Sequence, residues 1–419
     1  MNLKSILIAG ILSFQLISLA QQSSIQYYRP NNADGLNTFE TTKNDTVGFD
    51  GVKVRIGGDF AMQFQGLNQE NTADNLVDLG ANFNLPSANL NLDVQLLDGV
   101  QMHLRTYLSS RHHFEAWIKG GHVQFDKLDF IKPDFMSGLM ERVSLRIGLD
   151  EFNYGDAHFR RSDNARAIFN PFVGNYIMDG FSTEVFGELT VQESGFLGVV
   201  GLTNGKLNQS PVINDDSDNQ PSFYGKLGYD KAFDNDLRVR LTGSWYLNHG
   251  TTTGTWLYGG DRAGSRYYNV LHTTDGEGGN FDGRFNARFR KITAFQVNPF
   301  IKYKGLELFG IYEIADGNDE IAPSVNEGQF TQMAAEMLYR FGNDESFYVG
   351  GRFNEVTGSM VDGAPEGSIS RMNFGGGWFI SKNILIKLEY VKQAYHGSWS
   401  GRLDGAQFEG IMGEAVISF

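Results

Sequence analysis

The feature that most constrains this chain is a strict two-residue alternation of apolar and polar side chains. In the stretch DLRVRLTGSWYLN, residues 236–248, Leu241 and Trp245 fall on one face of an extended chain. Arg238 and Arg240 fall on the other face, because successive side chains of a β-strand point to opposite sides. Such a strand needs two unlike environments, either a protein core and bulk water or a lipid bilayer and an aqueous lumen.

The same alternation recurs along the chain from residue 52 to the last residue. It predicts sixteen strands, each near the ~9–11 residues with which a tilted strand crosses a bilayer. The predicted strands span residues 52–65, 89–97, 100–109, 113–125, 143–150, 180–190, 195–204, 221–231, 237–248, 291–303, 306–316, 328–341, 346–356, 368–379, 383–394 and 407–419. Because no linker interrupts them, we expect one all-β transmembrane antiparallel barrel over residues 52–419.

The predicted connections between strands alternate in length. Short links such as 97–99 and 304–305 carry turn residues, whereas 151–179 and 249–290 are long. Short turns at one end and long loops at the other are typical of a bacterial outer-membrane barrel. A soluble sandwich has no reason to sort its loops in this way. The link 126–142 breaks the pattern, because it is long where a short turn is expected.

Composition agrees with an aromatic-rich barrel. The chain has 51 glycines, 33 phenylalanines and 17 tyrosines, and it contains no cysteine. The absence of cysteine excludes a disulfide framework and a thiolate metal site. The last predicted strand ends on Phe419, and a final amphipathic strand that ends in phenylalanine resembles the assembly signal of outer-membrane barrels.

Two segments precede the predicted barrel. Residues 1–20 combine Lys4 with an apolar run and small residues before Gln21, which predicts a signal peptide and export from the cytoplasm. Residues 21–51 show no clear alternation, and we interpret them as a periplasmic N-terminal segment that packs into or under the barrel mouth.

Three stretches resemble a known family: NLNLDVQLLDGVQMHL (89–104), TYLSSRHHFEAWIKGGHVQFD (106–126) and FNYGDAHFRRSDNARAIFNPFVGNYIMDGF (152–181). They resemble porin-like barrels related to the phosphate-selective porins O and P. The resemblance implies a sixteen-stranded barrel, usually trimeric, with an inward-folded third outer loop that narrows the pore. That loop corresponds to residues 151–179 here.

The resemblance also implies which side chains of this loop form the pore constriction. They would be Arg160, Arg161 and Arg166, together with Asp156 and Asp163. Phosphate-binding members of the family carry ladders of basic residues in this region. Here acidic residues stand among the arginines, so the motif is specific for the broad porin group and not for phosphate.

Strand parity assigns further basic side chains to the lumen. The expected pore-lining residues are Arg105, Lys119, Arg146, Arg238, Arg240, Arg288, Arg290 and Lys302. Rings of basic side chains favour anions. A strip of Arg284, Arg288, Arg290 and Lys302, together with Arg238, Arg240 and the third-loop arginines, therefore leads to the hypothesis of a mild anion preference. The alternative is that these arginines pair with lumen carboxylates and stiffen the wall.

Several polar motifs carry weaker functional signals. His112 and His113 are adjacent on a strand end and point opposite ways, so we expect no metal site there. NDDSDN at 214–219 lacks the glycine and glutamate of a calcium loop and is interpreted as a solvated acidic loop. His158 and Ser162 are types used in hydrolysis, but no Gly-x-Ser-x-Gly elbow accompanies them. We therefore expect no enzyme activity.

The predicted function is a porin of the bacterial outer membrane that allows passive diffusion of small hydrophilic solutes. Its expected partners are outer-membrane lipid, small solutes that include anions, and two further copies in a homotrimer. No cofactor and no nucleic acid is expected. Two alternatives remain open: a barrel receptor that binds a ligand with the long loop 249–290, and, less favoured, a barrel hydrolase that uses His158.

Overall fold

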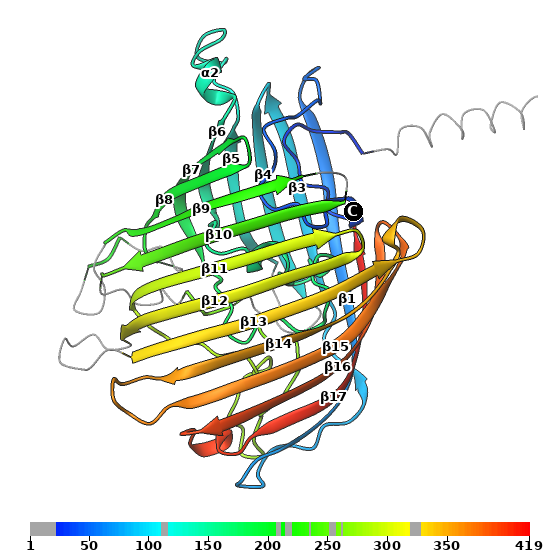
Figure 1. Ribbon diagram of the computed structural model, residues 1–419, viewed down its shortest axis with the longest axis vertical. Helices are drawn as coiled ribbons and strands as arrows, with labels where there is room; N and C mark the ends of the chain where they lie inside the picture. The colour runs from blue at the N-terminus through cyan, green and yellow to red at the C-terminus, as the bar shows by residue number, and fades with distance from the viewer. Residues whose placement is uncertain are drawn as a thin grey trace, which may run out of the picture.

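The computed structural model describes residues 22–109, 116–206, 211–213, 220–233, 236–250, 257–260, 263–318 and 328–419. Within them one antiparallel sheet closes into a barrel (Figure 1), because β1 pairs with β3 along one edge and with β17 along the other. The strands are β1 (Lys53–Glu70), β2 (Asn82–Phe83), β3 (Ser87–Leu97), β4 (Val100–Ser109), β5 (Trp117–Phe125), β6 (Val143–Glu151), β7 (Thr183–Glu193), β8 (Phe196–Thr203), β9 (Ser222–Ala232), β10 (Leu237–Asn248), β11 (Lys291–Tyr303), β12 (Leu306–Asn318), β13 (Gly328–Phe341), β14 (Phe347–Ser359), β15 (Gly367–Ser381), β16 (Ile384–Gly397) and β17 (Gln407–Ser418).

The sixteen predicted strands correspond to the sixteen strands of the barrel wall. The additional strand, β2, is only two residues long and pairs with Phe64 and Gln65 of β1. β1 extends beyond its predicted end to Glu70, because β17 pairs with it as far as Gln407, whereas β5 begins later than predicted, at Trp117. Each strand neighbours the next one along the chain, and this up-and-down order matches the predicted barrel.

The two faces of β10 are those that the alternation predicts. Arg240 is 2% exposed and points inward, whereas its neighbour Leu241 is 53% exposed on the outer surface. The same outward apolar face recurs around the barrel. Its exposed members include Leu90, Ile147, Val200, Leu227, Phe295, Met337, Phe374 and Leu388. A closed barrel leaves no unpaired sheet edge, so its backbone is satisfied while this apolar surface contacts lipid.

A bulge in β5 turns one lysine toward the lumen. Arg105 pairs with Gly120 and Thr106 with Ile118, so Lys119 is an extra residue on β5. Bulges of this kind bend a strand and re-aim a side chain. Lys119 is buried inside the barrel as a result, while Ile118 is exposed outside. A role of Lys119 in lining a pore stays a prediction.

The last residue completes the closure of the barrel. The backbone N–H of Phe419 donates to the carbonyl of Gly58, and the N–H of Gly58 donates to the carbonyl of Phe419, each at 3.1 Å. A Cβ at position 58 would lie 3.3 Å from the Phe419 ring, so glycine allows this close approach. The C-terminal aromatic is thus tied to β1 at the seam.

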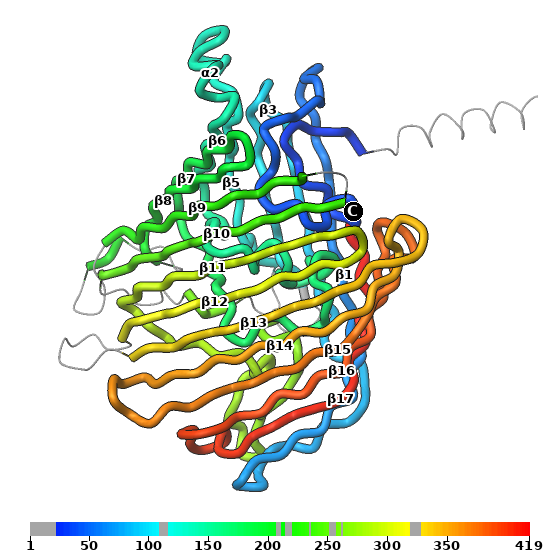
Figure 2. Tube along the Cα trace, viewed as in Figure 1, coloured from blue at the N-terminus to red at the C-terminus, as the bar shows by residue number. Residues whose placement is uncertain are grey.

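The exceptional connection 126–142 projects beyond the wall at the end of the barrel that carries the short turns (Figure 1). It contains the short helix α2 (Ser137–Met140). Figure 2 shows the dark-blue N-terminal segment folded at this same end. No helix in the described ranges is long and apolar enough to cross a membrane.

Candidate pore constriction

The β6–β7 connection, residues 152–182, is almost entirely buried and contacts inward-facing side chains of distant strands. The backbone N–H of Asp156 donates to Asn298 of β11 at 2.9 Å, and that of Ile177 donates to Asn354 of β14 at 2.7 Å. Since β11 and β14 lie far around the wall from β6, the segment reaches across the barrel interior.

A glycine allows the closest approach of this segment to the wall. Gly155 has a φ of +65°, in the left-handed region that favours glycine. A Cβ at this position would overlap the side-chain amide of Gln296 on β11. Any other residue would therefore be strained at this φ and would require the Gln296 side chain or the segment to shift.

Asp156 is fully buried at the centre of a charged network. Its carboxylate accepts from Arg240 Nε at 2.8 Å and from Lys226 Nζ at 2.8 Å. Thr242 donates a third hydrogen bond at 2.8 Å. Burial acts to raise the pKa of Asp156, but the cationic Arg240 and Lys226 outweigh it and hold the pKa well below its usual range. The carboxylate is therefore charged and fastens the segment to β9 and β10.

The two adjacent arginines of the segment are also paired. Arg160 Nη2 lies 2.6 Å from Glu336 of β13 and 3.5 Å from Glu307 of β12. Arg161 Nε lies 3.0 Å from Asp179, and its Nη2 contacts Glu151. Both guanidiniums thus have carboxylate partners. Such contacts are expected if the arginines pair with carboxylates of the lumen and stiffen the wall.

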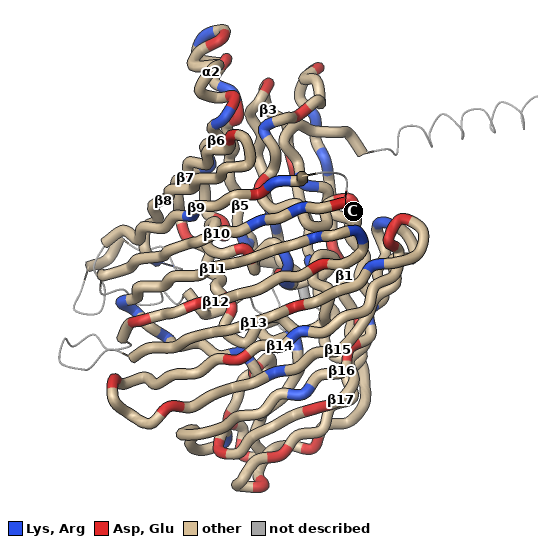
Figure 3. The backbone as a smooth tube through the Cα atoms, viewed as in Figure 1, with Lys and Arg blue, Asp and Glu red and all other residues tan. Residues whose placement is uncertain are grey.

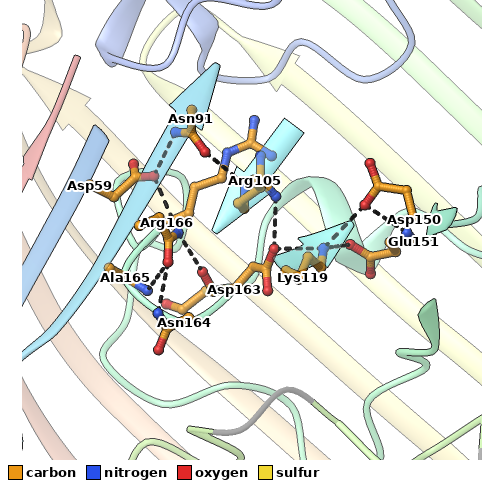
Figure 4. Close-up of polar contacts among 12 residues, drawn as sticks. Asp59, Asn91, Arg105, Lys119, Asp150, Glu151, Asp163, Asn164, Ala165 and Arg166 are labelled. Carbon is orange, nitrogen blue, oxygen red and sulfur yellow. Dashed lines mark hydrogen bonds and ion pairs between the residues drawn. The ribbon is translucent and has the colours of Figure 1, made fainter. Parts of the chain in front are cut away.

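Asp163 joins the segment to β4 and β5. Its Oδ2 accepts from Arg105 Nη1 and from Lys119 Nζ, each at 2.9 Å (Figure 4). Lys119 also lies 3.5 Å from Asp150 of β6. One acidic residue of the predicted constriction therefore pairs with two of the predicted pore-lining cations.

Arg166 differs from the other arginines of the segment. Its Nε donates to Asn31 at 3.3 Å, and its guanidinium lies 4.8 Å from the Phe169 ring. The guanidinium of Arg29, in the N-terminal segment, lies 3.9 Å from the centroid of the same Phe169 ring. Two guanidiniums thus share one aromatic ring, and in the described residues neither has a carboxylate at ion-pair distance.

The N-terminal segment lies inside the barrel and supplies functional side chains. Glu40 lies 2.7 Å from Arg240 Nη1 and 3.2 Å from Lys226 Nζ. Asn31 donates to Asp59 of β1 at 2.8 Å, and Lys43 pairs with Asp126 at 2.9 Å. That residues 21–51 form a periplasmic N-terminal segment stays a prediction.

The long β10–β11 connection also enters the interior. Tyr258 donates to Glu313 of β12 and Tyr267 to Glu389 of β16, each at 2.8 Å. Arg266 Nη2 lies 2.6 Å from Glu414 of β17. The described residues of this connection therefore cover the inner wall, a position unlike the outward capture loop that the receptor alternative requires.

Most other predicted lining cations are paired across neighbouring strands. Arg146 lies 3.2 Å from Glu188, Arg238 lies 2.6 Å from Asp230, and Lys302 lies 2.6 Å from Glu345. Figure 3 shows basic and acidic positions interleaved over the wall, without a purely basic sector. This pairing reduces the field that each cation projects into the lumen.

The predicted basic strip is not continuous. Arg290 lies just before β11 and Lys302 lies near its other end, so about twelve residues, or about 40 Å of extended chain, separate them. Arg288 precedes the strand, is exposed and has a φ of +52°, so strand parity does not apply to it. The prediction of a single strip was wrong, because it extended the register of β11 into the preceding loop.

A cavity of about 230 Å³ remains between the inserted segments and the wall formed by β3 to β7. Its lining includes Arg29 and Glu40 from the N-terminal segment, Arg166 from the β6–β7 connection, and His103 and His122 from the wall. Sequence reasoning missed the two histidines and the N-terminal residues. Alternation marks His103 as an inward position in phase with Arg105, but it places His122 opposite to Lys119, and only the bulge on β5 turns both inward. Residues 21–51 carry no periodic signal.

Other sequence motifs do not assemble into a second site. Asn170 donates to Ser162 Oγ at 3.2 Å, and no hydrogen bond links Ser162 to His158 in this described segment. Burial lowers the pKa of His158 well below its usual range. The candidate residues 1–20, 112–113 and 214–219 lie outside the described residues.

The closed wall, the apolar outer surface and the polar interior define an outer-membrane β-barrel with the porin fold. No family model matches the chain, and no curated protein is significantly similar to it in sequence. Among solved structures, the anion-selective porin from Comamonas acidovorans has 10% identity and a TM-score of 0.53, with 88% of this chain and 100% of that chain covered. OmpT of Vibrio cholerae, in its trimer form, has 10% identity and a TM-score of 0.52, with the same coverage. These similarities establish the fold, and the chain is a protein of the bacterial outer membrane.

Proposed function

We propose that this barrel is a passive diffusion porin for small hydrophilic solutes. The observation that carries the proposal is the polar cavity between the β3–β7 wall and the inserted segments. Both basic and acidic side chains line the cavity. Small polar solutes are therefore better solvated there than apolar ones. Residues 152–182 narrow the lumen, and flux follows the concentration gradient without a cofactor.

A mild anion preference forms the finer part of this proposal. Arg29 and Arg166 support it, because both line the cavity and lack a carboxylate at ion-pair distance within the described residues. Burial and then Arg166 lower the pKa of Arg29. A nearby anion would reduce the repulsion between these two groups. The relation to phosphate-selective porins O and P remains part of the proposal.

The solute pathway can be tested with purified protein in liposomes. Sugars and small salts should enter protein-containing vesicles and be excluded from protein-free vesicles. In planar bilayers, the reversal potential across a salt gradient should have the sign that corresponds to a larger permeability for anions than for cations. A non-leaking barrel would contradict the porin proposal, whereas cation preference would contradict only its finer part.

Trimer formation is a separate proposal. One similar solved structure is described as a trimer form, and the outer surface of this barrel is apolar enough to pack against lipid or further copies. Mass measurement of the detergent-solubilised protein, corrected for bound detergent, should give three chains per particle. A single-chain mass would contradict the trimer and would leave the diffusion pathway untouched.

A further inference from the structure

Two histidines face the cavity from neighbouring strands. His103 on β4 lies directly opposite His122 on β5 in the pairing register. Their ring centroids are 5.5 Å apart, and both side chains line the cavity. Directly opposite residues on one face of an antiparallel pair are close enough to share a ligand.

A carboxylate engages the Nδ1 atom of each histidine. His103 Nδ1 lies 2.6 Å from Asp93 of β3, and His122 Nδ1 lies 2.8 Å from Asp150 of β6. A neutral imidazole that donates through Nδ1 keeps a lone pair on Nε2. The two side chains are 18% and 15% exposed, and no hydrogen bond to either Nε2 occurs among the described residues. Both lone pairs are therefore available on the cavity side.

This arrangement matches the surroundings of a metal-binding histidine. Such histidines commonly donate their second ring nitrogen to a carboxylate, which fixes the tautomer and the ring orientation. Metal–nitrogen distances of about 2.0–2.1 Å place two imidazole centroids on one tetrahedral ion roughly 5 Å apart. The observed 5.5 Å is close to that separation.

The site would be an open one. In the described ranges, no group of three or more His, Asp or Glu side chains has an arrangement that could hold a metal ion. Two histidines would therefore be the protein ligands, and water would complete the coordination. The carboxylates of Asp93 and Asp150 offset the charge of a cation, while Arg146 at the same wall is paired with Glu188 at 3.2 Å.

We propose that His103 and His122 bind a divalent transition-metal ion of the class that prefers imidazole ligands, such as Ni²⁺, Cu²⁺ or Zn²⁺. Asp93 and Asp150 are positioning residues, because they act through the histidines. An ion held at this point occupies the polar cavity, and its presence obstructs the diffusion pathway. The metal site itself does not depend on the proposed transport function.

The binding test uses the full mature chain in detergent micelles near neutral pH. Isothermal titration with NiCl₂ should show one ion per chain. The variants His103→Gln and His122→Gln should each weaken binding at least tenfold, and Asp93→Asn or Asp150→Asn should weaken it about 10–100-fold. His249→Gln is the matched control, because His249 is exposed at the end of β10, and its ring lies 3.2 Å from the Thr293 hydroxyl, outside the cavity lining. Heat-modifiable migration in gels verifies that each variant is folded.

Two results would overturn the metal site. Folded His103→Gln and His122→Gln variants could retain the affinity of the unmodified chain, or the unmodified chain could fail to bind Ni²⁺. Obstruction is tested separately in planar bilayers, where Ni²⁺ should lower the conductance reversibly and EDTA should restore it. Binding without a change in conductance would contradict the obstruction. If the protein conducts no current at all, the titration still decides the metal site.

Discussion

Arg240 of β10 holds both carboxylate oxygens of Asp156, with Nε–Oδ2 at 2.8 Å and Nη2–Oδ1 at 2.9 Å. This bidentate pair connects the barrel wall to the segment that crosses its interior. Such planar pairs add geometric specificity to charge attraction. The bore of the barrel therefore depends on ion pairs as well as on strand number.

The first prediction concerns this connection. Asp156→Ala leaves Arg240 and Lys226 buried with fewer partners, and loss of one member of a buried ion pair costs about 3–5 kcal/mol. We expect a lower urea midpoint of barrel unfolding and faster proteolysis of residues 152–182. Asp362→Ala is the control, because Asp362 is exposed in the β14–β15 connection and is not among the residues with positive φ. Equal stability of both variants would contradict the role of Asp156.

The second prediction tests the lipid-facing surface. Leu241→Arg should destabilise the inserted barrel by about 2–4 kcal/mol if residue 241 lies near the bilayer midplane. Phe233→Arg, beside the β9–β10 turn, should cost only about 0–1 kcal/mol because charges near the interface remain hydrated. Equilibrium unfolding from lipid vesicles measures both values. The reverse order of the two costs would show that the bilayer contacts a different part of the wall.

The third prediction tests the two cavity arginines without carboxylate partners at ion-pair distance. Arg29→Gln and Arg166→Gln should each reduce the anion-to-cation permeability ratio by about fivefold, since one partly screened charge is worth about 1 kcal/mol. Reversal potentials across a salt gradient give this ratio. Arg142→Gln is the matched control, because Arg142 is exposed and pairs with Glu193 at 2.9 Å. An unchanged ratio in both cavity variants would contradict the proposed anion preference.

The fourth prediction concerns pH and the N-terminal segment. Burial acts to raise the pKa of Glu40, but Arg240 and Lys226 lower it to about 2 from its ordinary value of 4.5. Because the folded pKa is depressed, the stabilisation is complete above pH 4.5 and is lost as the pH falls toward about 2. Limited proteolysis of residues 22–48 should accelerate across this interval.

Glu40→Gln provides the comparison for the pH experiment. The variant lacks the titrating carboxylate, so its proteolysis rate should already be raised at neutral pH and should change less on acidification. Asp50→Asn serves as the control, because Asp50 is exposed and pairs only with Lys53 at 2.6 Å. A Glu40→Gln variant with the same pH response as the unmodified chain would show that other groups control release.

The fifth prediction measures the space that the N-terminal segment occupies. A chain that lacks residues 22–48 but keeps the predicted signal peptide should form a barrel with a larger single-channel conductance. The expectation follows from the burial of Gln26 and Asn31 and from the contacts of Glu40 with the wall. The full-length chain is measured in parallel. An equal conductance would show that the limiting cross-section lies elsewhere.

The alternation of side chains was sufficient to predict the sixteen strands, their order and the two faces of the wall. It placed Arg240 inside and Leu241 outside, because a side-chain period of two depends only on local backbone geometry. The bulge on β5, which turns Lys119 inward, is visible only in the pairing of β4 with β5. Where the backbone leaves the strand, as at Arg288, the same reasoning was wrong.

Which cations are neutralised was decided only by the tertiary structure. Arg160 meets Glu336 across 176 residues, and Arg240 meets Glu40 across 200 residues. No local pattern encodes such pairs, because they depend on how the inserted segments cross the closed barrel. The sequence by itself determined a membrane barrel with a charged lumen. The path of the segments through that lumen determined that most arginines are paired, that Arg29 and Arg166 have no carboxylate at ion-pair distance in the described residues, and that two histidines face the remaining cavity.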